Sequence, residues 1–169
     1  MKQLYLVRHA KSSWKYSRLD DFERPLNHRG RKDAPAMGTV LKKRKVSPDL
    51  ILSSPASRAA MTTRILAARM GHPLEKVVYP AALYETDKSG IIDIIHRVGP
   101  DVDRLMIVGH NPDITRLANH CGSNPVNHFP TCGVYAIRLD VTSWKKIGRR
   151  RGKTEFFDFP KKYRSGAGG

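Results

Sequence analysis

The sequence predicts an α/β domain, a three-layer sandwich in which helices cover both faces of an open, mostly parallel sheet. Two observations predict this class. Short apolar runs that suit buried strands alternate along the chain with longer segments whose apolar residues recur at helical spacing. The chain has 169 residues, of which 40% are hydrophobic, and this size suits a single globular domain. We expect that domain to cover residues 1–160.

The first two predicted elements are a buried strand and a capped helix. Leu4–Val7 is a short, continuous apolar run, which is typical of a strand covered on both faces. Asn27 provides a side-chain oxygen that can cap a helix expected over residues 28–44. Pro35 falls in the early part of that segment, where the pattern still predicts a helix. The chain therefore begins as a strand followed by a helix.

The next pair repeats this order. A second strand is expected at residues 50–52, where Leu, Ile and Leu follow one another. The helix that follows has Ser54 or Ser57 as its candidate cap and extends to about Met70. Gly71 ends it, because glycine adopts the left-handed conformation that closes helices.

The second half of the chain continues the alternation. Isoleucines recur along one predicted helix, and continuous apolar runs mark the strands around it. The last strand is expected at an edge of the sheet. The predicted helices cover residues 88–98 and 113–120, and the predicted strands cover residues 77–79, 105–108, 134–139 and 155–159.

The charge of the chain is strongly positive. Lys and Arg number 31 against 15 Asp and Glu, so the formal net charge is +16. A field of that sign attracts polyanions and phosphorylated partners, although an ordinary basic surface would have the same composition. Residues 161–169 are rich in lysine, arginine and glycine, and we expect them to form a flexible tail.

Several classes of protein are excluded by composition. No window approaches 18 uncharged apolar residues, so the sequence predicts no membrane-spanning helix and no membrane partner. Arg8 and His9 interrupt the N-terminal apolar run too soon for a secretory signal. Two cysteines are too few for a disulfide framework or a four-cysteine zinc site. We therefore expect a cytoplasmic location.

Charged and polar groups follow three of the predicted strands at the point where each strand ends. Arg8 and His9 follow the first strand, Arg58 follows the second within Ser53–Arg58, and His110 follows the fourth. In an open α/β sheet, ligands bind at these carboxyl ends. Two guanidinium forks and two imidazoles at one edge describe a pocket for a phosphoryl group. The sequence has no P-loop and no acidic metal cluster, which argues against a metal-dependent NTPase or kinase.

Four segments in series carry a resemblance to a known family. In the family's order and spacing, from about residue 2 to about residue 140, they resemble the histidine phosphatase superfamily and, within it, the SixA-type phosphohistidine phosphatases. The resemblance implies the phosphoglycerate mutase-like fold, in a minimal version without a lid subdomain. The segments are LVRHAKSSW (6–14), RPLNHRG (24–30), SSPASRAAMT (53–62) and VGHNP (108–112).

The resemblance assigns roles residue by residue. His9 matches the histidine that becomes phosphorylated, Arg8 and Arg58 match the arginines that hold the phosphoryl oxygens, and His110 matches the second pocket histidine. Ser12, from its place in the first motif, is a further candidate for binding substrate, with a turn-stabilising role as the alternative. No cofactor or metal ion is expected, because phosphoryl transfer here needs only positioned donors and a nucleophile.

A general acid is harder to find in the sequence. Glu85 resembles the acid position of the mutase-like branch, and a solvated loop glutamate is the alternative. An alkoxide leaving group needs such an acid. The imidazole released from phosphohistidine has a pKa of about 6.5 and carries its own proton, so Glu85 would matter less for that substrate.

Together with these residues, the resemblance implies a metal-independent phosphatase acting on phosphohistidine in a signalling protein, with a histidine phosphotransfer domain as one such partner. Short gaps between the motifs leave little room for a lid, and an open site suits a protein side chain. A phosphatase of small phosphoesters and a catalytically idle phosphate-binding module are the alternatives. A nucleic-acid partner is not expected, because the chain has no zinc-finger pattern and no aromatic-rich RNA-binding motif.

Overall fold

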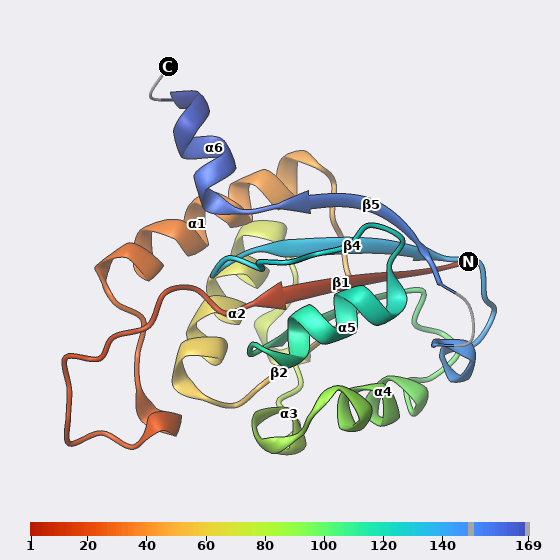
Figure 1. The fold of residues 1–169 in the computed structure, drawn as a ribbon, viewed down its shortest axis with the longest axis horizontal. Coiled ribbons are helices and arrows are strands. Elements are labelled where there is room, and N and C mark those ends of the chain that lie inside the picture. Colours follow the sequence, from red (N-terminus) through yellow and green to blue (C-terminus); the bar gives the residue numbers. More distant parts are fainter. Residues whose placement is uncertain (149–150, 168–169) are drawn as a thin grey trace.

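A computed structural model describes residues 1–148 and 151–167. Its centre is a five-stranded sheet in the order β2-β3-β1-β4-β5 (Figure 1). The apolar runs predicted as strands form four of its members, and the expected edge strand is the fifth. The strands are β1 (Lys2–Arg8), β2 (Leu50–Ser53), β3 (Arg104–Gly109), β4 (Val134–Leu139) and β5 (Lys153–Asp158).

The sheet is mixed, and only part of it is parallel. β1 pairs with β3 in parallel, and β3 pairs with β2 in parallel. β4 is antiparallel to both of its neighbours, β1 and β5. The reason lies in residues 122–133, which return to the carboxyl end of β1, where the Arg8 N–H donates to the Gly133 carbonyl at 3.2 Å. Because β4 starts at that end, it runs against β1.

Helices cover both faces of the sheet (Figure 1). α1 (His28–Lys43) and α2 (Ser57–Met70) pack on one face. The other face carries α3 (Ala82–Glu85), α4 (Lys88–His96) and α5 (Asp113–Cys121). Side chains of β1 alternate between the two layers, as the period of a strand requires: Leu4 and Leu6 join one core, and Tyr5 and Val7 join the other. The predicted three-layer architecture is therefore confirmed.

The helices begin and end only in part at the residues that the sequence predicts. Asn27 caps α1, since its Oδ1 accepts the Gly30 N–H at 2.9 Å, and Gly71 ends α2 at a φ of 76°. The predicted serine cap of α2 is wrong, because the capping position is Ala56. Ser54 instead folds back so that its Oγ accepts the Ala56 N–H at 3.2 Å, before the helix starts.

The strand predicted at residues 77–79 is also absent. A single bridge joins Val78 to Leu52, with the Val78 N–H donating to the Ile51 carbonyl at 3.0 Å. A short 3-10 helix, Leu74–Lys76, occupies the chain just before it. Pro80 follows directly and has no N–H to continue a ladder, so the pairing ends after one residue.

The flexible tail predicted after residue 160 is corrected by the structure. Residues Pro160–Ala167 form helix α6, and residues 168 and 169 lie outside the described part of the chain. Asp158, at the end of β5, holds the first turns, because the Tyr163 hydroxyl donates to its carboxylate at 2.9 Å and the Lys162 ammonium at 3.2 Å. Arg164 adds an ion pair with Asp33 of α1. The basic, glycine-rich composition of this segment does not predict these contacts.

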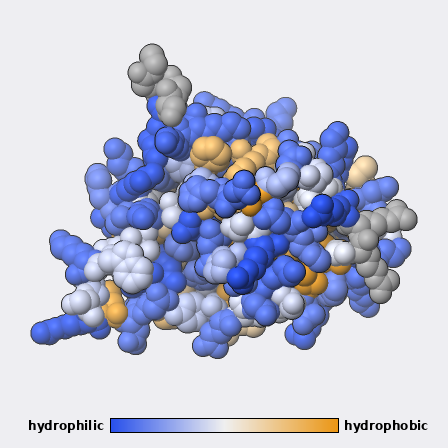
Figure 2. All heavy atoms as spheres, viewed as in Figure 1, coloured by the Kyte–Doolittle hydropathy of each residue, from blue (hydrophilic) through white to orange (hydrophobic). Residues whose placement is uncertain are grey.

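The outer surface reflects the charge of the sequence. The face seen in Figure 2 is mostly hydrophilic, with small hydrophobic spots that do not merge. None of the helices in the described residues is long and apolar enough to cross a bilayer.

Candidate active site

The register of the sheet brings the two motif histidines together. Arg8 of β1 pairs with Gly109 of β3, so the residues that follow them, His9 and His110, leave the sheet side by side. Their ring centroids are 5.2 Å apart. Arg58 joins them from the first turn of α2, which begins just beyond the carboxyl end of β2. The four residues predicted from the strand ends therefore share one site.

His9 is held as a neutral imidazole. Its side chain is 8% exposed, and its Nδ1 lies 2.7 Å from the Ala10 carbonyl oxygen. A carbonyl only accepts hydrogen bonds, so Nδ1 carries the proton and Nε2 keeps its lone pair. Burial is the main cause that lowers the pKa of His9 to about 3. The charges of His110, Arg58 and Arg8 act in the same direction, and the hydrogen bond to the Ala10 carbonyl opposes them. A neutral imidazole with a free Nε2 is a nucleophile.

His110 is oriented by a serine at the end of β2. Its Nε2 lies 2.7 Å from the Ser54 Oγ. Burial and then the charge of Arg58 lower the pKa of His110 to about 4. The ring of Tyr84 meets it edge-on, with centroids 5.8 Å apart. Both histidines of the site are therefore uncharged near neutral pH.

We call Arg8, His9, Arg58 and His110 the quartet. Three of its nitrogen atoms are buried without a hydrogen-bond partner: Arg8 Nε, Arg58 Nε and His110 Nδ1. The described residues contain five such side-chain atoms in all, so most of them gather at this one place. Buried polar groups normally have partners, and each exception calls for an explanation. The Arg8 fork is nevertheless fixed, because its Nη1 donates to the Phe129 carbonyl at 2.8 Å. Positioned donors of this kind suit a tetrahedral oxyanion.

Asp21 connects the site to the loop before α1. Its Oδ2 accepts hydrogen bonds from Arg58 Nη2 at 2.9 Å and from the Tyr84 hydroxyl at 2.8 Å. Its Oδ1 accepts from Arg24 Nε at 3.1 Å. Burial alone would raise the pKa of Asp21, but the hydrogen bonds from Tyr84 and Arg58 outweigh it and lower the pKa to about 2. Asp21 is therefore an anion that pairs with the cations of the site.

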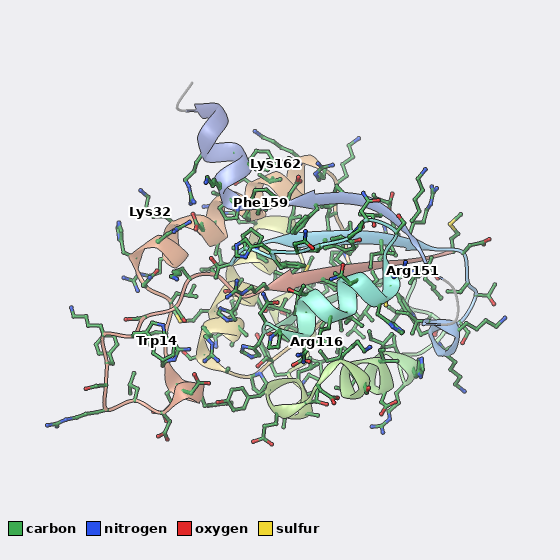
Figure 3. All side chains as sticks on the ribbon, viewed as in Figure 1. Trp14, Lys32, Arg116, Arg151, Phe159 and Lys162 are labelled. Atoms are coloured by element: carbon green, nitrogen blue, oxygen red, sulfur yellow. The ribbon has the colours of Figure 1, made fainter. Side chains whose placement is uncertain are left out.

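Ser12 contacts a residue that the strand-end pattern did not single out. Its Oγ accepts a hydrogen bond from Arg24 Nη1 at 2.9 Å. Arg24 is itself 7% exposed, and its guanidinium stacks on the Trp14 ring at 3.5 Å from the centroid. Trp14 lies on the loop to the left in Figure 3. Ser12 thus supports the buried Arg24.

A cavity of about 230 Å³ opens beside the quartet. It takes in Arg58 and His110 from the quartet, and Tyr84 from α3. The other lining residues are Asp21, Leu83, Thr86, Ile91, Asn111 and Asp113.

Glu85 does not reach this cavity. It is exposed, and it forms no hydrogen bond or ion pair with the described residues. It is the last residue of α3, and its neighbour Tyr84 is the side chain that lines the cavity. The structure therefore does not place the predicted acid with the four other residues. Asp21, from the 3-10 helix Asp21–Glu23, and Tyr84 of α3 occupy that region, and the strand-end pattern does not report either of them.

Cys132 is bonded to the backbone of Arg8 and His9. Its backbone N–H donates to the carbonyls of Arg8 and His9 at 3.0 and 3.1 Å, and its side chain is fully buried. Burial raises the pKa of its thiol. Cys132 is a packing residue that holds the backbone of the site.

Comparisons with known proteins agree with this geometry. The family model described as the histidine phosphatase superfamily (branch 1) matches residues 4–87. A protein of Mycobacterium tuberculosis without assigned function is 31% identical over 143 residues, which are 79% of this chain and 87% of the relative. Phosphoglycerate mutase 1 of Saccharomyces cerevisiae is 37% identical over 67 residues, 38% of this chain and 27% of the mutase.

Solved structures extend the likeness to nearly the whole chain. A proposed phosphohistidine phosphatase SixA from Agrobacterium tumefaciens matches with a TM-score of 0.79 and 26% identity, covering 94% of this chain and 98% of the other. The protein histidine phosphatase SixA in complex with tungstate matches with a TM-score of 0.81 and 20% identity, covering 95% and 99%. The fold and the family support a phosphatase. With its two histidines and two arginines brought together at one edge of the sheet, the chain belongs to the histidine phosphatase superfamily and resembles its SixA-type members.

Proposed function

We propose that this protein is a metal-independent phosphatase that works through a phosphohistidine on His9 and removes phosphate from phosphohistidine in a signalling protein. The observation that carries the proposal is the state of His9. Its Nδ1 proton is engaged by the Ala10 carbonyl, so the Nε2 lone pair faces a site lined by guanidinium groups. Arg8 and Arg58 supply the positive charge that a metal ion supplies in other phosphatases.

In the first step, His9 Nε2 attacks phosphorus and forms a P–N bond. The bond from phosphorus to the leaving group breaks on the opposite side, and its electron pair goes to the leaving atom. Arg8, Arg58 and His110 hold the phosphoryl oxygens through the three donors that lack partners within the protein. The product of this step is a phosphorylated His9 and the released carrier.

In the second step, water attacks the phosphorus of phosphorylated His9. The P–Nε2 bond breaks, its electron pair returns to Nε2, and the proton of the water goes to solvent. The low pKa of His9 favours this return, because the imidazole leaves as a neutral group. Phosphate is then released and His9 is ready for another cycle.

The supply of protons supports phosphohistidine as the substrate. Asp21 is the carboxylate that contacts Arg58, and its pKa of about 2 keeps it ionised, so it has no proton to give. Glu85 lies outside the cavity. Asp113 lines the cavity, but its carboxylate is already engaged, because its Oδ1 accepts the Lys88 N–H at 3.1 Å and lies 3.5 Å from Arg116 Nη1. An alkoxide leaving group would need an acid, whereas an imidazole leaving group, with a pKa of about 6.5, carries its own proton.

The likeness to SixA-type structures gives independent support. One of them holds tungstate, an oxyanion of phosphate-like shape, in a fold that aligns with 95% of this chain. Glucosyl-3-phosphoglycerate phosphatase from a mycobacterium also aligns, with a TM-score of 0.70 and 17% identity. At 20% and 17% identity, these two likenesses show the fold alone. Because the fold is shared with a phosphatase of a small phosphoester, that substrate class is the competing one.

Phosphate release from two substrates, measured in the presence of a chelator, tests the proposal. The substrates are a phosphohistidine peptide and an aryl phosphate, with His9→Ala as the inactive control. We expect release from the peptide to exceed release from the ester, together with an acid-labile phosphoryl group on His9 that His9→Ala lacks. Faster release from the aryl phosphate would favour a small-molecule phosphatase. Binding of phosphate without release from either substrate would make the protein an idle phosphate-binding module.

A further inference from the structure

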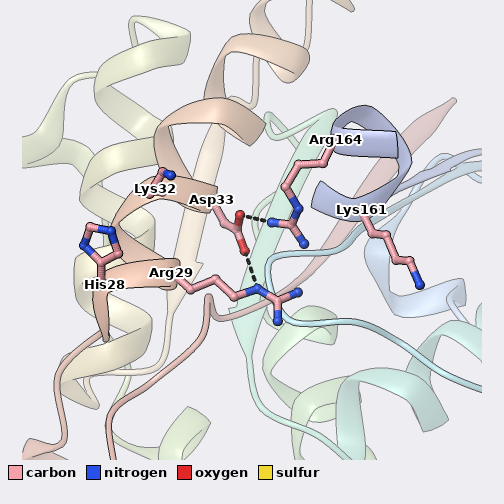
Figure 4. A pocket seen from close by; sticks show the side chains of 6 residues that line it. All are labelled: His28, Arg29, Lys32, Asp33, Lys161 and Arg164. Atoms are coloured by element: carbon pink, nitrogen blue, oxygen red, sulfur yellow. Dashed lines mark hydrogen bonds and ion pairs between the residues drawn. The ribbon is translucent and has the colours of Figure 1, made fainter. Parts of the chain in front are cut away.

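A second hollow lies between the start of α1 and helix α6 (Figure 4). Its volume is about 670 Å³, larger than the 230 Å³ cavity beside the histidines. We call it the basic cleft, because four of its six lining residues carry a lysine or arginine side chain. The six lining residues are His28, Arg29, Lys32, Asp33, Lys161 and Arg164.

One buried carboxylate organises the basic cleft. Asp33 is 4% exposed and forms ion pairs with Arg164 of α6 and with Arg29, whose Nε lies 3.5 Å from its Oδ2. Figure 4 shows Asp33 between these two arginines. Because its single charge is shared by two cations, none is left for the lysines. Lys32 and Lys161 are exposed and have no carboxylate partner among the described residues.

The basic cleft flanks the proposed active site. The Asn27 N–H donates to the Lys11 carbonyl at 3.0 Å, two residues beyond His9. Gly30 packs so closely on the same carbonyl that a Cβ there would lie 2.2 Å from the oxygen. The first turn of α1, which carries the cleft, therefore rests on the segment that carries the nucleophile. Lys32 appears in Figure 3 at the same end of the molecule as the tip of the β1 arrow in Figure 1.

The shape and chemistry of the cleft select one class of occupant. It is much larger than a single phosphate needs, since a water molecule occupies about 30 Å³ of liquid. Its lysines are separate point charges on long stems, which suits several carboxylates spread over a surface. It offers no phenylalanine, tyrosine or tryptophan on which a base could stack, as single-stranded nucleic acids require.

We propose that the basic cleft docks an acidic surface of the phosphorylated protein and so directs its phosphohistidine to His9. This inference rests on the proposed function for the substrate that it delivers. Charge complementarity beside a reaction site raises the rate of encounter and sets the orientation of the partner. The docked protein contacts Lys32 and Lys161 with its carboxylates, and its phosphoryl group reaches the quartet.

The test compares two phosphohistidine peptides of equal length, one with flanking glutamates and one with glutamines, and phosphoramidate as the smallest P–N substrate. The variant is Lys32→Glu/Lys161→Glu. The control of equal charge is Lys145→Glu/Lys146→Glu, which changes the two exposed lysines of the 3-10 helix Trp144–Lys146. That helix lies at the amino end of the strands, where the Trp144 indole donates to the Val102 carbonyl at 2.7 Å.

We expect the wild type to hydrolyse the glutamate peptide with a kcat/KM about tenfold above that of the glutamine peptide, an advantage that rises as salt is lowered. We expect Lys32→Glu/Lys161→Glu to lose this advantage through a higher KM for the glutamate peptide, and the control variant to keep it. In both variants, the rate of phosphoramidate hydrolysis should stay within about twofold of the wild-type rate. Lys32→Gln/Lys161→Gln shows an intermediate loss and guards against a folding defect.

Three results would overturn the docking proposal. The first is equal kcat/KM for the two peptides. The second is an equal loss of phosphoramidate hydrolysis in the variant, which would make the cleft part of the reaction site. The third is tighter binding of a single-stranded oligonucleotide than of the unphosphorylated glutamate peptide, with the same lysines required. Binding of that peptide, followed by fluorescence anisotropy, needs no turnover. A protein that binds it but hydrolyses nothing would keep the docking surface and lose the proposed function.

Discussion

Arg58 directs both of its terminal nitrogens at Asp21: Nη2 donates to the carboxylate oxygen Oδ2 at 2.9 Å, and Nη1 donates to the backbone carbonyl at 2.6 Å. A phosphoryl group that needs the same fork must therefore compete with a carboxylate of the protein. The Asp21 carboxylate binds Arg58 only weakly, because its side chain is half exposed and solvent screens the ion pair. We therefore expect Asp21 to hold Arg58 in place until an oxyanion replaces it.

Removing that competitor should tighten the binding of oxyanions. We expect Asp21→Asn to lower the Kd for tungstate by up to about fivefold, since a half-exposed ion pair contributes up to about 1 kcal/mol. Isothermal titration in chelator measures the change. Asp20→Asn removes a neighbouring loop carboxylate that makes no capping bond, and it should leave the Kd unchanged. Weaker tungstate binding by Asp21→Asn would show that Asp21 positions Arg58 more than it competes for it.

The stability of the protein should fall in mild acid because of the two site histidines. The pKa of His9 is lowered to about 3 and that of His110 to about 4, so the unfolded chain binds more protons than the native one below pH 6.5. Their contribution is fully present above pH 6.5 and is lost as the pH falls toward 4. The loss is on the order of 1 kcal/mol per pH unit for each histidine. Urea unfolding at pH 7 and pH 5 measures it, and His9→Asn should flatten the dependence. An equal drop in the variant would refute this origin.

Ser54 should matter through His110. Its Oγ is the partner of His110 Nε2, and Ser54→Ala leaves that buried nitrogen without one. We expect a loss of about 1–3 kcal/mol in the free energy of unfolding. We also expect a fall of about tenfold in kcat, because a mobile His110 holds the phosphoryl oxygens less well. Ser57→Ala, whose hydroxyl contacts only the Met61 sulfur at 3.8 Å, is the matched control. Unchanged kcat in Ser54→Ala would remove the positioning role.

The two neighbours at the end of α3 should behave differently. Glu85→Gln should change phosphohistidine hydrolysis by less than about twofold, because Glu85 is exposed and outside the cavity. Tyr84→Phe removes a hydrogen bond to Asp21 at 2.8 Å, and the pKa of that carboxyl should rise. Steady-state kinetics on the phosphohistidine peptide and NMR titration of Asp21 measure the two effects. A large loss in Glu85→Gln would restore it as the general acid.

The sequence predicts the part of the site that strands deliver. Arg8, His9 and His110 follow continuous apolar runs, so their meeting at one edge of the sheet is a consequence of register. Asp21 and Tyr84 have no such marker. They reach the cavity from two short helices, Asp21–Glu23 and α3, which meet through tertiary contacts such as the Tyr84–Asp21 hydrogen bond that no local pattern reports.

The fold shows the same division. Asn27 and Gly71 act within a few residues of their own positions, and both were predictable. The direction of β4 depends on where residues 122–133 return, and the helix at Pro160–Ala167 depends on a buried aspartate far away in the sequence. Neither dependence is local, so apolar periodicity and composition could not reveal them.

Cys132 gives the site a final property. It is one of two cysteines, both of them buried, and burial raises the pKa of the Cys121 thiol to about 12 and that of Cys132 as well. Thiolate, the form that peroxides attack, is therefore scarce at neutral pH. Where the nucleophile of a phosphatase is a cysteine, oxidative stress can silence it. On the mechanism proposed above, the reacting atom is a ring nitrogen and the thiol of Cys132 is fully buried, so we expect dephosphorylation to continue when the surroundings become oxidising.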